Sequence, residues 1–147
     1  MRSDGLRRSL LALVLLGLTG LTSELLLLGH YESSPQLLPF AAIVLAFGSL
    51  GWHGMAPGAH SIRAVRAVMA LLVVVGLVGV VLHFRGNMEF QLDIDPAQPT
   101  WTLFKHVMRA KAPPALAPGA MAQLGLLGLV YTWRHPSAGS WDTSKGE

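Results

Sequence analysis

The sequence predicts an all-helical integral membrane protein, a bundle of four transmembrane helices with a polar insert between the third and the fourth. Apolar residues make up 52% of the 147-residue chain and charged residues only 13%, a balance that a soluble domain of this size rarely reaches. The apolar residues also gather in four stretches, each close to the roughly 20 residues that a helix needs to cross about 30 Å of hydrocarbon. These stretches are 9–29, 37–55, 64–84 and 115–133.

Each stretch is expected to be helical because lipid offers the backbone no hydrogen-bond partner, and a helix satisfies its own N–H and C=O groups. Short connections before the second and third stretches predict antiparallel neighbours in an up-down-up-down bundle. Every stretch also carries two glycines three residues apart, which allow helices to pack closely in lipid. We expect these glycines to mark helix seams: Gly17 and Gly20, Gly48 and Gly51, Gly76 and Gly79, and Gly125 and Gly128.

Positive charge predicts the orientation in a bacterial cytoplasmic membrane. The first connection, 30–36, holds no lysine or arginine, whereas arginines flank the other ends of the apolar stretches at Arg2, Arg7, Arg8, Arg63, Arg66 and Arg134. Both termini are therefore expected in the cytoplasm. The first stretch is longer than the apolar part of a cleaved signal peptide, so we expect it to remain as a helix. Residues 1–135 would form the transmembrane domain and 136–147 a flexible cytoplasmic tail.

The insert, residues 85–112, is expected to lie outside the cytoplasm and to hold a strand and a short helix. From Asn87 to Asp95 polar and apolar residues alternate strictly, which is the period of a strand with one buried face. Thr100 suits a helix N-cap, and apolar residues follow it at helical spacing beside basic ones. We expect this second element to be an amphipathic helix in the membrane interface, built on Trp101, Phe104, Val107 and Met108.

Enzyme motifs do not occur in the sequence: it has no nucleophile elbow, phosphate loop, cysteine pair or HExxH zinc motif. We therefore expect a non-catalytic accessory or assembly subunit. A strand without a partner in its own chain would offer its edge to another membrane or extracytoplasmic protein. The net charge of +3 is spread over both membrane faces, so the lipid bilayer and not nucleic acid is the expected anionic partner. The candidate protein-binding residues are Phe90, Leu92, Asp93, Asp95, Trp101 and Phe104.

A second hypothesis places a metal ion or haem at the outer ends of the first and third helices. Imidazoles on facing helices can bind a transition metal together with nearby carboxylates, or ligate haem from opposite sides. The candidate ligands are His30, Glu32, His83 and Glu89. Such histidines can equally be solvated or bonded to helix-end carbonyl groups.

A third hypothesis concerns Glu24, the only acidic residue well inside a predicted helix. Ionisable groups at such depth are costly and concentrate at functional sites. A carboxyl group that exchanges its proton there would suit a small proton-coupled transporter. The structural alternative is a buried ion pair, or a protonated carboxyl at a helix seam.

Overall fold

The computed structural model describes residues 2–111 and 113–139, and the described chain is almost entirely helical. No strand occurs among these residues, so the all-helical class is confirmed. Ala112 of the predicted insert and residues 140–147 of the predicted tail lie outside the described residues. The elements are α1 (Arg2–Leu27), η1 (Ser34–Gln36), α2 (Leu37–Met55), α3 (Ala59–Ile94), α4 (Thr100–Met108), α5 (Ala117–Thr132) and η2 (Pro136–Ala138).

Within the described residues, three segments are long and apolar enough to cross a membrane: Asp4–Leu27, Ser34–Met55 and Ala59–Ile94. This agrees with a membrane protein. α5 coincides closely with the fourth apolar stretch, but its 16 residues fall short of the roughly 20 that span the hydrocarbon. Thus three of the four expected spans reach the length of a transmembrane helix.

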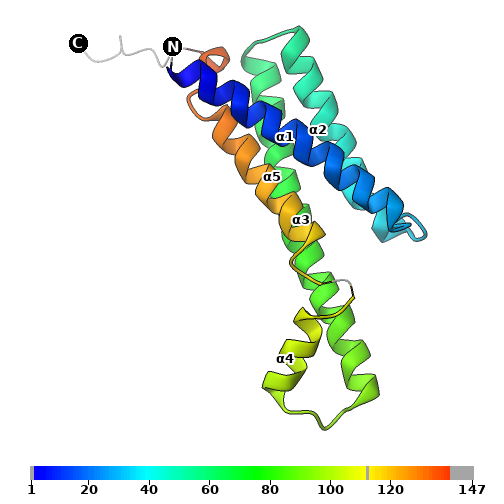
Figure 1. Cartoon of the computed structure of the whole chain (residues 1–147). Helices are drawn as coiled ribbons and strands as arrows, with labels where there is room; N and C mark the ends of the chain where they lie inside the picture. Colours follow the sequence, from blue (N-terminus) through cyan, green and yellow to red (C-terminus); the bar gives the residue numbers. More distant parts are fainter. Residues whose placement is uncertain (1, 112, 140–147) are drawn as a thin grey trace.

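α2, α4 and α5 all pack on α3 (Figure 1). α5 lies along it, α2 packs beside it, and α1 lies against α5 with a smaller contact to α2. Many large apolar side chains on the outward faces are exposed, which suits helices surrounded by lipid. The buried apolar core of the bundle comes from α1, α2, α3 and α5, and its most deeply buried members include Val14, Leu18, Ile43, Ile62, Val65, Met69 and Leu72.

Glycines allow the closest approach of α3 and α5. A Cβ added to Gly125 would lie 2.6 Å from the carbonyl oxygen of Met69, and one added to Gly76 would lie 2.6 Å from the backbone nitrogen of Ala122. Gly17, Gly79 and Gly128 also face a neighbouring helix. The predicted seams are therefore confirmed at these five positions. By contrast, a Cβ would meet nothing within 4 Å at three other members of the predicted pairs, Gly20, Gly48 and Gly51.

The predicted strand from Asn87 to Asp95 is wrong, because α3 continues unbroken to Ile94. The four alternating apolar residues separate onto two helix faces: Met88 and Leu92 are half-buried, whereas Phe90 and Ile94 are exposed. Residues four apart share a helix face, so a short alternation fits a helix with apolar residues on two sides. The helix also satisfies the backbone N–H groups that a lone strand would leave unpaired.

The end of α3 and the whole of α4 form a helical hairpin that extends beyond the other helices (Figure 1). We term this hairpin, residues 85–108, the arm. Val107 of α4 is fully buried, and Asn87 of α3 donates from Nδ2 to its carbonyl oxygen at 3.4 Å. In the turn, Gln98 donates from Nε2 to the carbonyl oxygen of Gln91 at 2.9 Å. α4 therefore packs on α3.

The start of α4 also corrects an expectation. Thr100 is the first residue of the helix, and Pro99 occupies the N-cap position without a side-chain hydrogen bond. Thr100 is thus not the cap. We expected this helix to lie alone in the membrane interface, but in the structure α4 packs on α3.

Candidate functional site

The structure brings together two of the four predicted metal ligands. His30, just after α1, and His83 of α3 stack with their ring centroids 6.0 Å apart and an angle of 18° between the ring planes. Glu32 and Glu89 are both exposed, on the connection after α1 and on the arm respectively. Among the described residues no group of three or more histidine, cysteine, aspartate and glutamate side chains could hold a metal ion. The pair could therefore supply two ligands.

Glu24 lies on the outward face of α1 and is exposed. No hydrogen bond or ion pair joins its side-chain carboxylate to another residue of the described chain, although its backbone carbonyl accepts from Leu28. It does not line either of the two cavities described below. Within one chain, then, Glu24 faces away from the helix core.

The predicted protein-binding residues lie on the arm. Phe90 is 63% exposed and Trp101 66% exposed, and the rings of Trp101 and Phe104 stack with centroids 5.4 Å apart. Asp93 and Asp95 are also exposed, whereas Leu92 is half-buried. Ile94, 64% exposed, is an apolar residue of this surface that the sequence reasoning left out. The helix keeps Ile94 on the exposed face of Phe90, four positions earlier, and moves Leu92 to the half-buried face.

A buried polar cluster occupies the opposite end of the bundle, where α2 turns into α3. His53 is 5% exposed, and its Nδ1 lies 2.9 Å from Oγ of Ser61, which is 2% exposed. A serine beside a histidine can be a nucleophile beside its base. Here the hydroxyl is buried and also contacts the carbonyl oxygen of Ala56 at 2.9 Å, so it joins the end of α2 to the start of α3.

The contacts of this cluster indicate where its imidazoles carry their protons. If Ser61 donates to Ala56, His53 donates from Nδ1 to Ser61 and keeps Nε2 as an acceptor. Nδ1 of His135 accepts from the backbone N–H of Ser137 at 3.2 Å, so neutral His135 carries its proton on Nε2. The two rings meet edge to face with centroids 4.9 Å apart. The contact with Ser137 thus holds His135 as a neutral imidazole.

Burial, a second imidazole and one arginine act on His135. Burial lowers the pKa of His135, and the nearby His53 and Arg7 lower it further. Arg7 of α1 donates from Nη2 to the carbonyl oxygen of Arg134 at 2.8 Å and lies 3.8 Å from the carboxylate of Asp4. These contacts hold the start of α1 against the end of α5.

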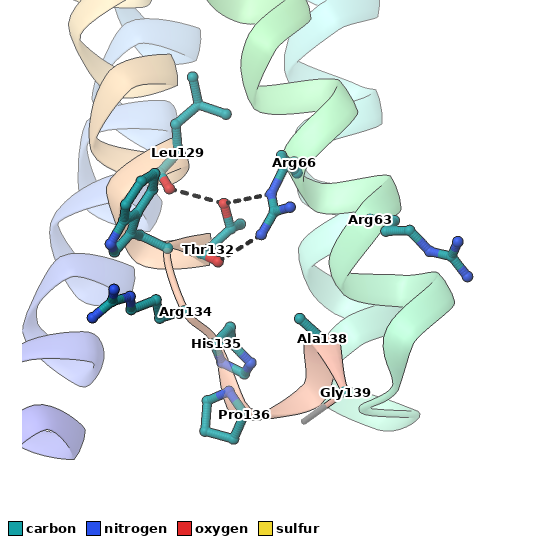
Figure 2. A pocket seen from close by; sticks show the side chains of 10 residues that line it. Arg63, Arg66, Leu129, Thr132, Arg134, His135, Pro136, Ala138 and Gly139 are labelled. Atoms are coloured by element: carbon teal, nitrogen blue, oxygen red, sulfur yellow. Dashed lines mark hydrogen bonds between the residues drawn. The ribbon is translucent and has the colours of Figure 1, made fainter. Parts of the chain in front are cut away.

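Two cavities open at this end. The larger, about 1190 Å³, is lined by arginines without any acidic side chain, and the smaller, about 280 Å³, lies beside Arg7 and Tyr131. Figure 2 shows that the arginines of the larger cavity do not converge: Arg63 and Arg134 point away to opposite sides, and Arg66 is directed at Thr132. A bound anion would therefore meet no preformed set of donors.

The sequence places His53, His60 and His135 at one end of the bundle but does not indicate that Ser61 and Tyr131 join two of them. His60 is exposed, whereas the ring of Tyr131 lies with its centroid 5.2 Å from that of His135. Serine next to the α2–α3 turn is the one signal for such a contact, because its hydroxyl can bond free backbone groups at a helix start.

No protein-family model, curated protein or solved structure matches this chain, so the geometry described above carries the functional argument.

Proposed function

We propose that this chain is a multi-pass protein of the bacterial cytoplasmic membrane that binds a second protein through the tip of its arm. In this proposal α5, extended by the segment before it, completes a fourth span. The protein acts as a non-catalytic accessory or assembly subunit. The observation that carries the proposal is the exposed apolar surface of the arm, beyond the membrane-spanning part of α3.

The charges of α3 support a division of this helix into a membrane-spanning part and a part that belongs to the arm. Arg66 and Arg85 are 19 positions apart, which corresponds to about 28 Å of helix and matches the roughly 30 Å of a hydrocarbon layer. The segment between them carries no acidic or basic residue other than His83. The nine remaining residues of α3, 86–94, continue for about 14 Å beyond it.

At that distance lipid tails do not cover the tip of the arm. Phe90 and Ile94, one turn apart on α3, and Trp101 at the start of α4 are 63%, 64% and 66% exposed there, and exposed apolar side chains away from lipid favour an interaction site. Exposed Asp93 in the last turn of α3 and exposed Asp95 just after the helix are close to them in the sequence. The partner expected from this surface is a protein with an apolar groove and a basic rim, because aromatic anchors supply binding energy and charges select the partner.

The orientation follows from the arginines. The contacts of Arg7 with Arg134 and of Arg66 with Thr132 gather the start of α1, the start of α3 and the end of α5 at one end of the bundle. An end with this excess of arginine is expected to face the cytoplasm, which places the arm outside it. Four basic residues of the segment 85–111 oppose this rule, Arg85, Lys105, Arg109 and Lys111, and exposed Glu89, Asp93 and Asp95 accompany them.

Site-specific photocrosslinking in the native membrane tests the proposal. A photoactivatable phenylalanine analogue replaces Trp101, and the proposal expects one discrete adduct with a different protein chain. Phe90→Ser and Ile94→Ser should each abolish this adduct without unfolding the bundle, since both side chains are exposed. Tyr31→Ser is the matched control, because Tyr31 is 55% exposed but lies outside the arm.

Charge supplies a second readout. The double variant Asp93→Lys, Asp95→Lys should weaken formation of the adduct if the partner has a basic rim. Adducts with lipid alone, or with a second copy of this chain, would contradict the proposed partner. So would an adduct that persists in both serine variants.

The stacked pair of His30 and His83 supports one alternative, a metal or haem site at the outer end of the bundle. The two imidazoles come from different elements and meet with ring centroids 6.0 Å apart. They could provide two ligands to a transition metal or to haem, with the remaining positions filled by water or by the porphyrin.

The visible spectrum and the metal content of the purified protein test this alternative. A Soret band, or stoichiometric metal, that disappears in the variant His30→Ala, His83→Ala would establish a cofactor site. His60→Ala serves as the control, because His60 is exposed at the start of α3. A colourless, metal-free sample would reject the alternative and leave partner binding through the arm.

A further inference from the structure

The outward face of α1 carries a carboxyl group in an otherwise apolar or weakly polar surface. Glu24 lies three residues, about 4–5 Å of helix, before the end of α1 at Leu27, and His30, in the turn just after α1, stacks on His83 near the end of the α3 span. Its neighbours on this exposed face include Leu16, 71% exposed, and Leu27, 88% exposed. If α1 spans the membrane, as proposed above, Glu24 meets lipid unless another helix covers it. An uncovered carboxyl at such depth is costly.

Gly20 lies one turn before Glu24 and has no packing role within the chain. A Cβ at Gly20 would meet nothing within 4 Å, whereas one at Gly17 would contact the side chain of Leu124. Thr19 and Ser23 share the exposed face with Gly20. Small residues permit close helix contact in lipid, so this face allows a second helix to approach the level of Glu24.

The polar groups of this face are complementary to a copy of themselves. Thr19 and Ser23 donate their hydroxyl protons to the carbonyl oxygens of Leu15 and Thr19, at 2.9 Å and 3.0 Å, so their oxygens can still accept. A carboxyl group that carries its proton supplies one donor and one acceptor. Two copies in one membrane orientation would bring parallel α1 helices together about a twofold axis, with each Glu24 beside the other.

We propose that a second copy of this chain packs on the face of α1 that contains Leu16, Gly20 and Glu24, forming a twofold dimer with the paired carboxyl groups in its interface. The inference rests on the proposed membrane-spanning role of α1 but is independent of the arm and of its partner. α2 also exposes glycines, Gly48 and Gly51, but that face carries no ionisable group in need of a partner.

Disulfide crosslinking in native membranes tests the dimer, and the chain suits the method because it contains no cysteine. Leu16→Cys should form a crosslinked dimer on mild oxidation. Val44→Cys on α2 is the matched control, since the two side chains are 71% and 69% exposed and both lie within their spans. The crosslinked fraction is expected to be roughly tenfold higher for Leu16→Cys, because intramembrane contact raises the effective thiol concentration by a large factor.

Two further changes, made in the Leu16→Cys chain, identify the contacts. Gly20→Leu should prevent crosslinking by separating the helices, whereas Gly48→Leu, also in open space within the chain, should not. Glu24→Leu should lower the dimerisation constant roughly tenfold, which is the ratio expected from one interhelical hydrogen bond in lipid. Glu24→Gln keeps a donor and an acceptor and should retain most of the dimer.

Failure of the dimer is distinguishable from failure of the membrane assignment. Extraction of membranes at high pH releases peripheral proteins, and release of the whole chain would reject the membrane-spanning role. A chain that stays in the membrane but gives equal crosslinking for Leu16→Cys and Val44→Cys would overturn the dimer alone. Crosslinking that survives both Gly20→Leu and Glu24→Leu would overturn the proposed interface.

Discussion

Arg66 of α3 donates a hydrogen bond from Nη2 to the backbone carbonyl oxygen of Thr132, the last residue of α5, at 3.0 Å. The final carbonyl groups of a helix have no partner within it, and a cation at this end is favourable to the helix dipole. Nε of the same guanidinium also lies 3.4 Å from Oγ1 of Thr132. One side chain thus satisfies the end of α5 and links it to the start of α3.

Removal of this link should destabilise the bundle. We expect Arg66→Gln to lower the free energy of unfolding by about 1 kcal/mol, the usual value for a partly exposed hydrogen bond with a favourable charge. Thermal unfolding in mild detergent measures the change. Arg63→Gln is the control, because Nε of Arg63 bonds only to Ala59 of its own helix. Equal effects of the two changes would contradict a specific role for Arg66.

A substitution of a glycine in the α3–α5 seam should destabilise the protein more than a substitution of a glycine in open space. Gly125→Ala would place a methyl group 2.6 Å from the Met69 carbonyl oxygen, so the two backbones must separate. We expect a loss of about 1–3 kcal/mol from overpacking. Gly48→Ala meets nothing within 4 Å and should be neutral or slightly stabilising, because alanine favours helix over glycine. The unfolding midpoints of Gly125→Ala and Gly48→Ala, compared in one detergent, measure this difference in stability.

Acidification should destabilise the arginine-rich end through His135. Its pKa in the folded protein is lowered from 6.5, first by burial and then by His53 and Arg7. The stability linked to this group is therefore fully present above about pH 6.5 and is lost as the pH falls towards and through the lowered value. Protonation of Nδ1 would also break its hydrogen bond from Ser137.

Melting curves between about pH 8 and pH 5 measure this dependence, a range that brackets the ordinary histidine pKa. His135→Gln should lose less stability on acidification than the unchanged protein does. His60→Gln should behave like the unchanged protein. A His135→Gln curve that falls just as steeply would show that other groups control the response.

The turn of the arm should depend on Gln98. Its Nε2 donates to the carbonyl oxygens of Gln91 and Asp95 at 2.9 Å and 3.1 Å, and its Oε1 lies 3.1 Å from Nδ1 of His106. We expect Gln98→Ala to speed amide hydrogen exchange in α4 at least fivefold, which corresponds to about 1 kcal/mol of local stability.

Exchange in α1, α2 and α5 should stay the same, because within the described chain α4 packs only on α3. Gln36→Ala, which removes a single bond to Ser33 in the connection before α2, should leave the arm unaffected. Faster exchange throughout the bundle would mean that the arm and the bundle unfold together.

The long apolar stretches predicted most of the helices, and α2 coincides with its stretch, Leu37–Met55. The strand prediction was wrong because four alternating apolar residues, from Met88 to Ile94, are compatible with both a strand and a helix. The packing of α4 on this segment decided between the two. His30 and His83 were expected at the outer ends of the first and third helices, and the structure stacks their rings there. The cluster of His53, Ser61 and His135 could not be predicted in detail, since it depends on how the α2–α3 turn meets the end of α5.

The sequence by itself determined that this chain is helical and carries segments apolar enough for lipid, because composition and segment length alone decide whether a backbone can be satisfied in hydrocarbon. Only the tertiary structure decided which glycines lie in seams, which side of the arm is exposed, and that Glu24 faces outward. Those outcomes depend on the rotation of each helix about its axis, and that rotation is set by packing against neighbours far away in the sequence.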